Sequence, residues 1–158
     1  MKKVFKYRKK LRLEQGRSLV FKIHKKVVGP DGDDYFVMVD PFGDKHLVPV
    51  EYYSLYNLEV GKSYLCKVDK INCLGRIFIE PPHPFYKENK SYLFEFSKMF
   101  TEKHKSGYVY SYYLFRDKNK YKAFLNAEHF KLAPGLQSGF HSFRVKKISK
   151  GRVCIDYR

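Results

Sequence analysis

The sequence contains no tryptophan and only three cysteines, Cys66, Cys73 and Cys154, none of which belongs to a CxxC pair. An odd number of cysteines at irregular spacing argues against a disulfide framework and against a zinc site built on cysteine pairs. We therefore expect structural thiols in a reducing, cytoplasmic environment.

Long hydrophobic runs and catalytic motifs are also missing. No stretch resembles a signal peptide or a membrane span, and the chain contains no GxSxG, GxGxxG or GxxxxGK[ST] motif. The six histidines are dispersed, and the aspartates around Gly32 lack the glutamate that would complete a calcium loop. These absences predict a protein that is not an enzyme and that holds no metal or cofactor.

Acidic residues are scarce. The chain has 32 lysines and arginines against 16 aspartates and glutamates, a net charge of +16. Residues 1–12 contain seven basic residues and no acid, residues 13–81 contain nine basic and ten acidic residues, and residues 82–158 contain sixteen basic and six acidic residues. The excess predicts a polyanionic partner, nucleic acid or an anionic membrane, that meets the two ends of the chain rather than its middle.

A segment in the middle of the chain recurs at its C-terminal end. Residues 61–80 and 139–156 each hold a long strand pattern, a glycine turn and a second strand that begins with Gly-Arg and ends on an acid. Upstream, residues 17–21 align with residues 90–94. A repeat of this length indicates a duplicated domain. We predict a basic arm at 1–12, a first domain at 13–81, a proline-rich connector at 82–86 and a second domain at 87–158.

Both copies have the alternating apolar pattern of strands, separated by glycine and proline turns. In the first copy we expect strands at residues 18–26, 35–40, 45–49, 63–72 and 76–80, with a helical turn at 50–56. In the second copy we expect strands at residues 90–100, 107–116, 120–126, 140–149 and 152–157, with a short helical piece at 127–131.

Five short strands with a helical insert between the third and the fourth are the outline of an OB-fold barrel. One stretch resembles the RNA-binding OB repeat of the largest ribosomal protein of the bacterial small subunit and of cold-shock proteins. The residues that carry this resemblance are Val48-Pro49, Val60-Gly61, Val68, Ile71, Gly75-Arg76-Ile77 and Ile79. The resemblance implies an all-β chain of two tandem OB-fold-like five-stranded barrels behind a basic N-terminal arm. It also implies that single-stranded RNA binds around strands two and three of a barrel.

Tyrosines dominate the second strand of the second copy. Tyr108, Tyr110 and Tyr112 alternate on one face, and Tyr113 and Phe115 lie on the other. A barrel strand buries one face only, so we expect the first set to face solvent and to stack on bases, each worth roughly 1–3 kcal/mol. The alternative is that these tyrosines pack a small core.

Basic residues near the tyrosines are expected to neutralise phosphates, although such a run can also be a merely solvated face. In the second copy they are Arg116, Lys118, Lys120, Lys122, Lys146, Lys147, Lys150 and Arg152, and in the arm they are Lys9, Lys10 and Arg12.

The first copy offers a secondary surface. Phe42 at a turn tip is expected to be exposed, with Lys45 and His46 beside it. Several acids that would repel phosphate crowd the same region, namely Asp31, Asp33, Asp34, Asp40 and Asp44. The first copy is therefore expected to be a scaffold or a docking domain.

The function that the sequence favours is non-catalytic binding of single-stranded nucleic acid, RNA rather than DNA, by base stacking and phosphate neutralisation. The alternative is a protein-interaction or accessory module of a larger nucleic-acid-processing assembly, which docks through its first domain. Binding of the arm to anionic lipid is disfavoured because the arm is short and has no amphipathic period. The oligomeric state stays open.

Overall fold

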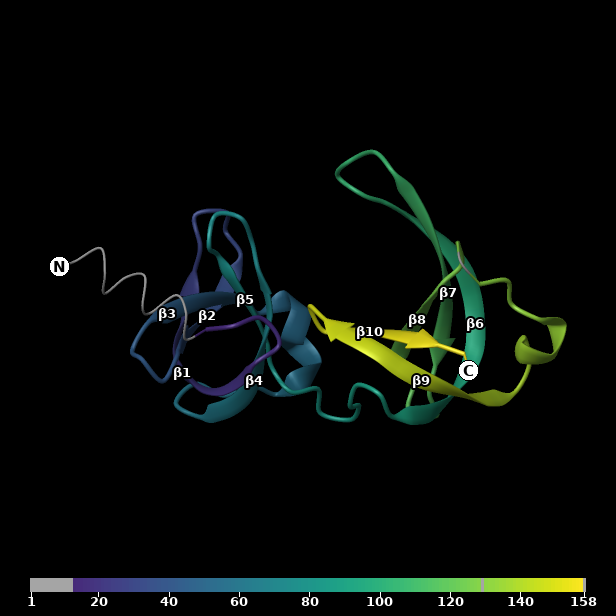
Figure 1. Ribbon diagram of the computed structural model, residues 1–158, viewed down its shortest axis with the longest axis horizontal. Coiled ribbons are helices and arrows are strands. Elements are labelled where there is room, and N and C mark those ends of the chain that lie inside the picture. Colours follow the sequence, from purple (N-terminus) through teal and green to yellow (C-terminus); the bar gives the residue numbers. More distant parts are fainter. Residues whose placement is uncertain (1–12, 129, 158) are drawn as a thin grey trace. The chain divides into compact units, whose positions relative to one another are not determined.

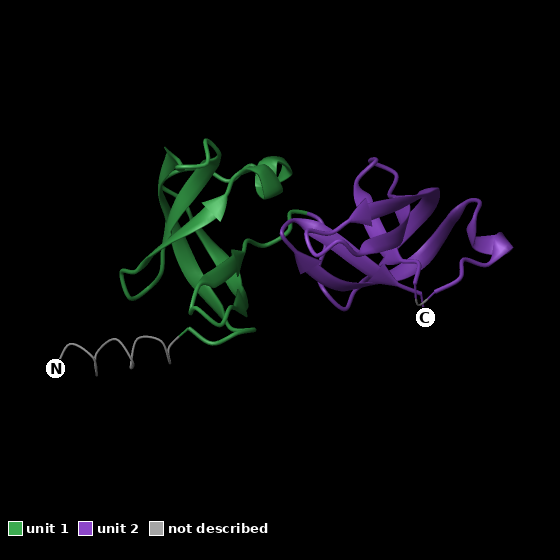
Figure 2. Cartoon of the chain, turned by 90° about the horizontal axis from the view of Figure 1, so that it is seen from above, with its two compact units in different colours: residues 1–84 green, residues 85–158 purple. Residues whose placement is uncertain are grey.

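A computed structural model describes residues 13–128 and 130–157 of the chain. The chain divides into two compact units, unit 1 with residues 1–84 and unit 2 with residues 85–158 (Figure 2). Each unit is built on five strands and one short 3-10 helix (Figure 1).

Unit 1 is a five-stranded sheet in which neighbouring strands are antiparallel. Its elements are β1 (Ser18–Val28), β2 (Asp34–Val39), β3 (Lys45–Pro49), η1 (Glu51–Tyr56), β4 (Ser63–Ile71) and β5 (Ile77–Glu80). The hydrogen-bonded order is β3-β2-β1-β4-β5. Within residues 13–84 no pairing joins β3 to β5, so the sheet remains open between these two edges rather than forming the barrel expected for this copy.

The strands of unit 2 close on themselves. Its elements are β6 (Ser91–Lys103), β7 (Val109–Arg116), β8 (Lys122–Asn126), η2 (Pro134–Leu136), β9 (Phe140–Ser149) and β10 (Arg152–Asp156). The order β10-β8-β7-β6-β9 returns to β10, because β10 pairs with β9 antiparallel and with β8 parallel at Cys154 and Phe124. The β6–β7 hairpin extends beyond the rest of the ring (Figure 1).

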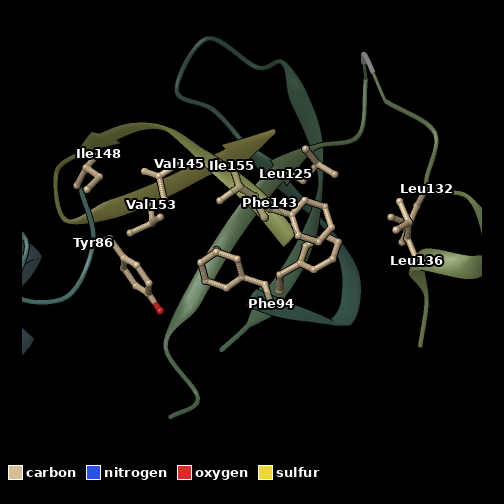
Figure 3. Packing of buried hydrophobic residues seen from close by; sticks show 12 residues of the cluster. Tyr86, Phe94, Leu125, Leu132, Leu136, Phe143, Val145, Ile148, Val153 and Ile155 are labelled. Atoms are coloured by element: carbon tan, nitrogen blue, oxygen red, sulfur yellow. The ribbon is translucent and has the colours of Figure 1, made fainter. Parts of the chain in front are cut away.

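Phenylalanine fills the interior in the absence of tryptophan. In unit 2, Phe94, Phe115 and Phe143 are almost fully buried (Figure 3). In unit 1, Phe21 and Met38 are fully buried. Each unit therefore has a core of its own. Burying one such side chain contributes roughly 1.5–3 kcal/mol to the free energy of folding.

The hydrogen bonds of the two units match. In unit 1, the Val68 amide donates to the Arg17 carbonyl at 2.8 Å. In unit 2, the Val145 amide donates to the Lys90 carbonyl at the same distance, 2.8 Å. The first strand is bulged at the equivalent place in both units, after Ile23 and after Phe96. The repeat in the sequence is thus a repeat in structure.

The expected helical piece at residues 127–131 is wrong. The Ala127 amide donates to the Ser111 carbonyl at 2.9 Å, and the Glu128 amide donates to the Asn126 side chain at 2.8 Å, so the chain bends there. The 3-10 turn comes later, at Pro134–Leu136, where proline stands at the first helical position. The helical turn expected in the first copy is confirmed as η1.

Candidate nucleic-acid interface

The outward side of β6, β7, β8 and β10 carries one cluster of rings with a guanidinium over it. We call this surface the aromatic face, and it consists of Phe100, Tyr110, Tyr112, Phe124 and Arg152. Side chains of a strand alternate between its two sides. Because Ala123, Leu125 and Val153 are buried in the core, their neighbours Phe124 and Arg152 point outward.

The rings of the aromatic face pack against one another. Phe100 and Tyr112 are paired across β6 and β7, and their rings stack with centroids 5.6 Å apart and planes inclined by 26°. The Phe124 ring meets Phe100 edge-on at 5.8 Å. Pairs of this geometry are worth roughly 0.5–1.5 kcal/mol beyond burial. The face is therefore a preformed surface rather than a set of independent side chains.

Arg152 covers two of these rings. Its guanidinium carbon lies 4.0 Å from the centroid of Phe124 and 4.7 Å from that of Tyr112. The Nη1 atom also donates to Glu102 Oε2 at 2.8 Å. A cation over an aromatic face contributes about 0.5–2 kcal/mol, whereas a partly exposed ion pair contributes less, about 0–1 kcal/mol. Both the rings and the carboxylate thus hold Arg152 in place.

The three tyrosines of the predicted ladder differ in exposure. Tyr108 precedes β7 and is 70% exposed, while Tyr110 and Tyr112 are half-buried. The Tyr110 ring meets the His104 ring edge-on at 6.1 Å. Partial burial is the main cause that raises the pKa of Tyr112. Tyr112 is thus not the open platform that the alternation predicted, because Arg152 lies over its ring and Phe100 stacks on it.

The division of β7 into two sides agrees with the sequence pattern. Phe115 is fully buried, and Tyr113 packs against the core and accepts a hydrogen bond from the Leu132 amide at 3.4 Å. Tyr110 and Tyr112 therefore point away from the core.

Of the four predicted cations from Arg116 to Lys122, two point to the same side of the sheet as the aromatic face and two stand in a turn. Arg116 and Lys122 are paired across β7 and β8. By the alternation of side chains along a strand, they point to the same side as Tyr112 and Phe124. The Arg116 guanidinium donates to the Lys120 carbonyl at 3.0 Å, which ties it to the β7–β8 turn.

Lys118 and Lys120 stand in that turn. Lys120 has a positive φ of 69°. Lys118 lines a different cavity of about 420 Å³, together with Tyr86, Tyr92, Leu93 and Phe140. The turn therefore separates these two lysines from the aromatic face.

The basic rim near the last hairpin surrounds Arg152. Lys147 is paired with Cys154 on β10, and Lys150 occupies the β9–β10 turn with a φ of 52°. Lys146 is exposed on β9. The predicted arm residues Lys9, Lys10 and Arg12 lie outside the described residues.

The secondary surface expected on the first copy differs from the expectation. Phe42 is partly buried against the core of unit 1 and does not offer a free ring. His46 is mostly buried, with Nε2 2.9 Å from Asp40 Oδ2. Lys45 alone is exposed as expected.

Sequence reasoning missed Phe100, Glu102 and Phe124. Phe124 stands between Ala123 and Leu125 in a short apolar strand, so strict alternation places it outside once its neighbours are assigned to the core. No comparable signal marks Phe100 or Glu102, because they join the face only through the register of β6 on β7.

The arrangement offers cationic and aromatic contacts. Among residues 13–128 and 130–157, no three His, Cys, Asp or Glu side chains gather where they could hold a metal ion. No helix in the described part of the chain is long and apolar enough to cross a membrane. Comparison with known protein families, with curated proteins and with solved structures finds no match.

Proposed function

We propose that this protein binds single-stranded nucleic acid on the aromatic face of unit 2, without catalysing a reaction. The observation that carries the proposal is the layer formed by Phe100, Tyr112 and Arg152. A guanidinium placed over aromatic rings can present its other side to a further planar group, and a nucleobase is such a group. Exposed Tyr108 and half-buried Tyr110 extend this surface along β7.

Phosphate contacts come from the cations that border the face. Lys122 on β8, Lys147 on β9 and Lys150 in the last turn surround the aromatic rings on several strands. Within residues 82–158 basic residues outnumber acids by sixteen to six. RNA is favoured over DNA by the resemblance of the first copy to RNA-binding OB repeats.

We also infer that each unit is an OB-fold variant, closed in unit 2 and open in unit 1. Two features support this inference. The helical insert lies between the third and fourth strands of both units, as η1 and η2. In unit 2 the ring joins the third strand to the fifth in parallel. OB barrels serve many ligands, so the fold by itself does not choose nucleic acid.

The test is a fluorescence-anisotropy titration of the full chain with labelled oligo-U at low and moderate salt. We expect Arg152→Gln to weaken binding by roughly tenfold, the loss of one stacked contact of about 1–3 kcal/mol. Lys131→Gln is the matched control, because Lys131 is an exposed cation of unit 2 that is not one of the residues of the face. Absence of binding at both salt concentrations would refute the proposal. Equal losses of affinity in the two variants would show that binding depends only on net charge.

A second candidate function is docking to a protein partner through unit 1. Val20 and Leu65 are paired across β1 and β4, and they are 54% and 60% exposed. Exposed apolar neighbours of this kind mark interaction surfaces when they form part of a larger patch. Leu65→Glu should abolish such docking without changing oligo-U binding, which a parallel co-purification and titration would measure.

A further inference from the structure

Because the two units are copies, each position of the aromatic face in unit 2 has an equivalent position in unit 1. The registers of the first and second strands make Val27 and Tyr35 equivalent to Phe100 and Tyr112. The register of the second and third strands places Leu47 at the position of Phe124. On the last strand, pairing to the fourth strand places Arg76 at the position of Arg152.

Of the groups around Arg152 in unit 2, the tyrosine is kept in unit 1 as Tyr35, and the others are different. Phe124 is replaced by Leu47 and Phe100 by Val27, so the partner rings are lost. In unit 1, Gly29 stands at the position equivalent to Glu102, so the acid is absent there as well. Conversely, Phe78 stands where unit 2 has Cys154, and Arg76 lies over the Phe78 ring at 5.1 Å. Arg76 thereby has a ring partner on its own strand.

The result is a cleft in unit 1 where unit 2 is filled by its own arginine. The cleft has a volume of about 440 Å³, and its lining includes Tyr35, Lys45, Leu47, Arg76 and Ile77. It lies on the β3 and β5 edges that no pairing closes. Its size falls within the range of ligand pockets, roughly 300–1,000 Å³.

We infer that this cleft binds one nucleotide of a single strand, with the base between Tyr35 and Leu47 and the phosphate near Lys45 and Arg76. The chemistry of the lining supports this ligand. Tyr35 supplies a ring, Leu47 and Ile77 supply apolar contacts, and Lys45 and Arg76 are exposed cations on opposite edges. The choice of ligand class rests on the function proposed for unit 2, whereas the cleft itself does not involve unit 2.

The Tyr35 ring is held in position by its own turn. Its hydroxyl donates to Asp31, which also accepts from the Asp33 amide at 3.1 Å. A Cβ atom on Gly29 would lie 2.6 Å from Tyr35 Cε2, so the ring packs directly on the glycine backbone. Such fixation lowers the cost of ordering a stacking partner on binding.

The acids of this region do not close the cleft to an anion. The Asp40 carboxylate is buried and is bonded to His46 and to the amides of its own turn. Asp34 lies 3.5 Å from the Lys26 ammonium. Asp31 keeps its charge and accepts hydrogen bonds from the Tyr35 hydroxyl and the Asp33 amide. Counting every acid of the first copy as a free charge therefore overstates the repulsion between unit 1 and a phosphate in the cleft.

The test is photocrosslinking of the full chain to oligo-U that carries 4-thiouridine, with crosslinked peptides located by mass spectrometry. We expect crosslinks to peptides that contain Tyr35 or Ile77, in addition to those of the aromatic face. Arg76→Gln and Tyr35→Leu should each lower the unit 1 crosslinks by about fivefold or more, as expected for losing one stacked or charged contact. Lys62→Gln, an exposed cation outside the cleft lining, is the control and should not change them.

Gly29→Ala is a second variant that keeps the test independent of charge, because its methyl group displaces the Tyr35 ring at a position that has no positive φ. It should remove the unit 1 crosslinks and leave those of unit 2 and the circular dichroism spectrum unchanged. Crosslinks confined to unit 2 overturn the inference and leave the proposed function standing. Crosslinks confined to unit 1 support the inference and refute the unit 2 site, and absence of both crosslinks and binding refutes both.

Discussion

At the scale of single residues, Glu102 is expected to weaken binding of the anionic ligand that we propose. Its carboxylate holds the Arg152 guanidinium at 2.8 Å and brings a negative charge to the edge of the aromatic face. This charge repels a phosphate that approaches the cations bordering the face. The cation–π contacts to Tyr112 and Phe124 do not depend on Glu102, so removal of the acid leaves Arg152 on the rings.

We therefore predict that Glu102→Gln tightens oligo-U binding by about two- to fivefold, the equivalent of an exposed ion pair of about 0.5–1 kcal/mol. Anisotropy titration at low salt measures this change. Glu128→Gln is the control, because Glu128 is an exposed acid in unit 2 that is not part of the face. An equal gain in both variants would show that only the total charge matters.

The three cysteines differ in burial, and Cys154 lies beside the aromatic face. Cys66 is fully buried, and burial raises its thiol pKa to about 12, while Cys73 is exposed. Burial also raises the pKa of Cys154, which lies on β10 beside Phe124. The thiolate is the reactive form, so reactivity falls as burial and pKa rise.

We predict that a thiol reagent at pH 8 labels Cys73 first, Cys154 more slowly and Cys66 only on unfolding. Saturating oligo-U should slow the labelling of Cys154 and leave Cys73 unchanged. Mass spectrometry of timed samples distinguishes the three sites. Unprotected Cys154 in a protein that binds oligo-U would place the ligand elsewhere.

At the scale of elements, one carboxylate organises the turn between the second and third strands in each unit. In unit 2, Asp117 Oδ1 accepts from the amides of Asn119 and Tyr121 at 2.8 and 3.0 Å, and Oδ2 accepts from the Tyr86 hydroxyl. In unit 1, Asp40 Oδ1 accepts from the amides of Phe42 and Asp44. This turn is conserved between the copies although the face beside it is not.

We predict that Asp117→Ala lowers the free energy of unfolding by about 2 kcal/mol or more, because it leaves a part-buried hydroxyl and two amides without their acceptor. Asp117→Asn retains an oxygen for the amides and should lose less. Urea unfolding followed by circular dichroism measures both, with Asn119→Ala as the exposed control in the same turn. A loss no larger for Ala than for Asn would contradict this account.

The strands were predictable from the sequence because alternation and glycine turns are local signals. The register was not, since β6 meets β7 through a bulge after Phe96 that has no mark of its own in the sequence. The same limit applies to the site. Alternation placed Tyr112 outside, but only the closure of β10 on β8 brings Arg152 over its ring. The helical piece was misplaced because the Asn126 side chain bonds the next turn and competes with a helix.

At the scale of the whole molecule, His83 makes the stability of the chain depend on pH. Burial lowers the pKa of His83 from its ordinary 6.5 to about 4, and its ring meets Tyr56 edge-on at 5.1 Å. As the pH falls below 6.5, the unfolded chain takes up a proton at His83 before the folded unit does. The stability that neutral His83 provides is therefore fully present above pH 6.5 and is lost as the pH falls toward 4.

We predict that the urea midpoint of the wild-type chain falls more between pH 7 and pH 5 than that of His83→Gln. Circular dichroism at the two pH values gives both midpoints. The carboxylates titrate alike in both proteins, so the difference between the two proteins isolates His83. Identical pH dependence would show that His83 is protonated as readily in the folded unit as in the unfolded chain.

The net positive charge of the chain is complementary to the negative charge of its proposed ligand. Residues 1–12 carry seven basic residues and no acid, and residues 82–158 have ten more basic than acidic residues. Each phosphate neutralised on a single strand contributes about −0.7 to the slope of log K against log salt. About five contacts then give a slope near −3.5.

We predict that replacing the basic residues of 1–12 by glutamine makes this slope less steep by about one or two units, because counterion release falls with the number of phosphates contacted. The crosslinks at the aromatic face and in the unit 1 cleft should persist, since base stacking there does not depend on the arm. Titration at several salt concentrations gives the slope, and the 4-thiouridine map gives the positions. An unchanged slope would remove the arm from the interface, whereas loss of both sets of crosslinks would make the arm, rather than the two faces, the main binding element.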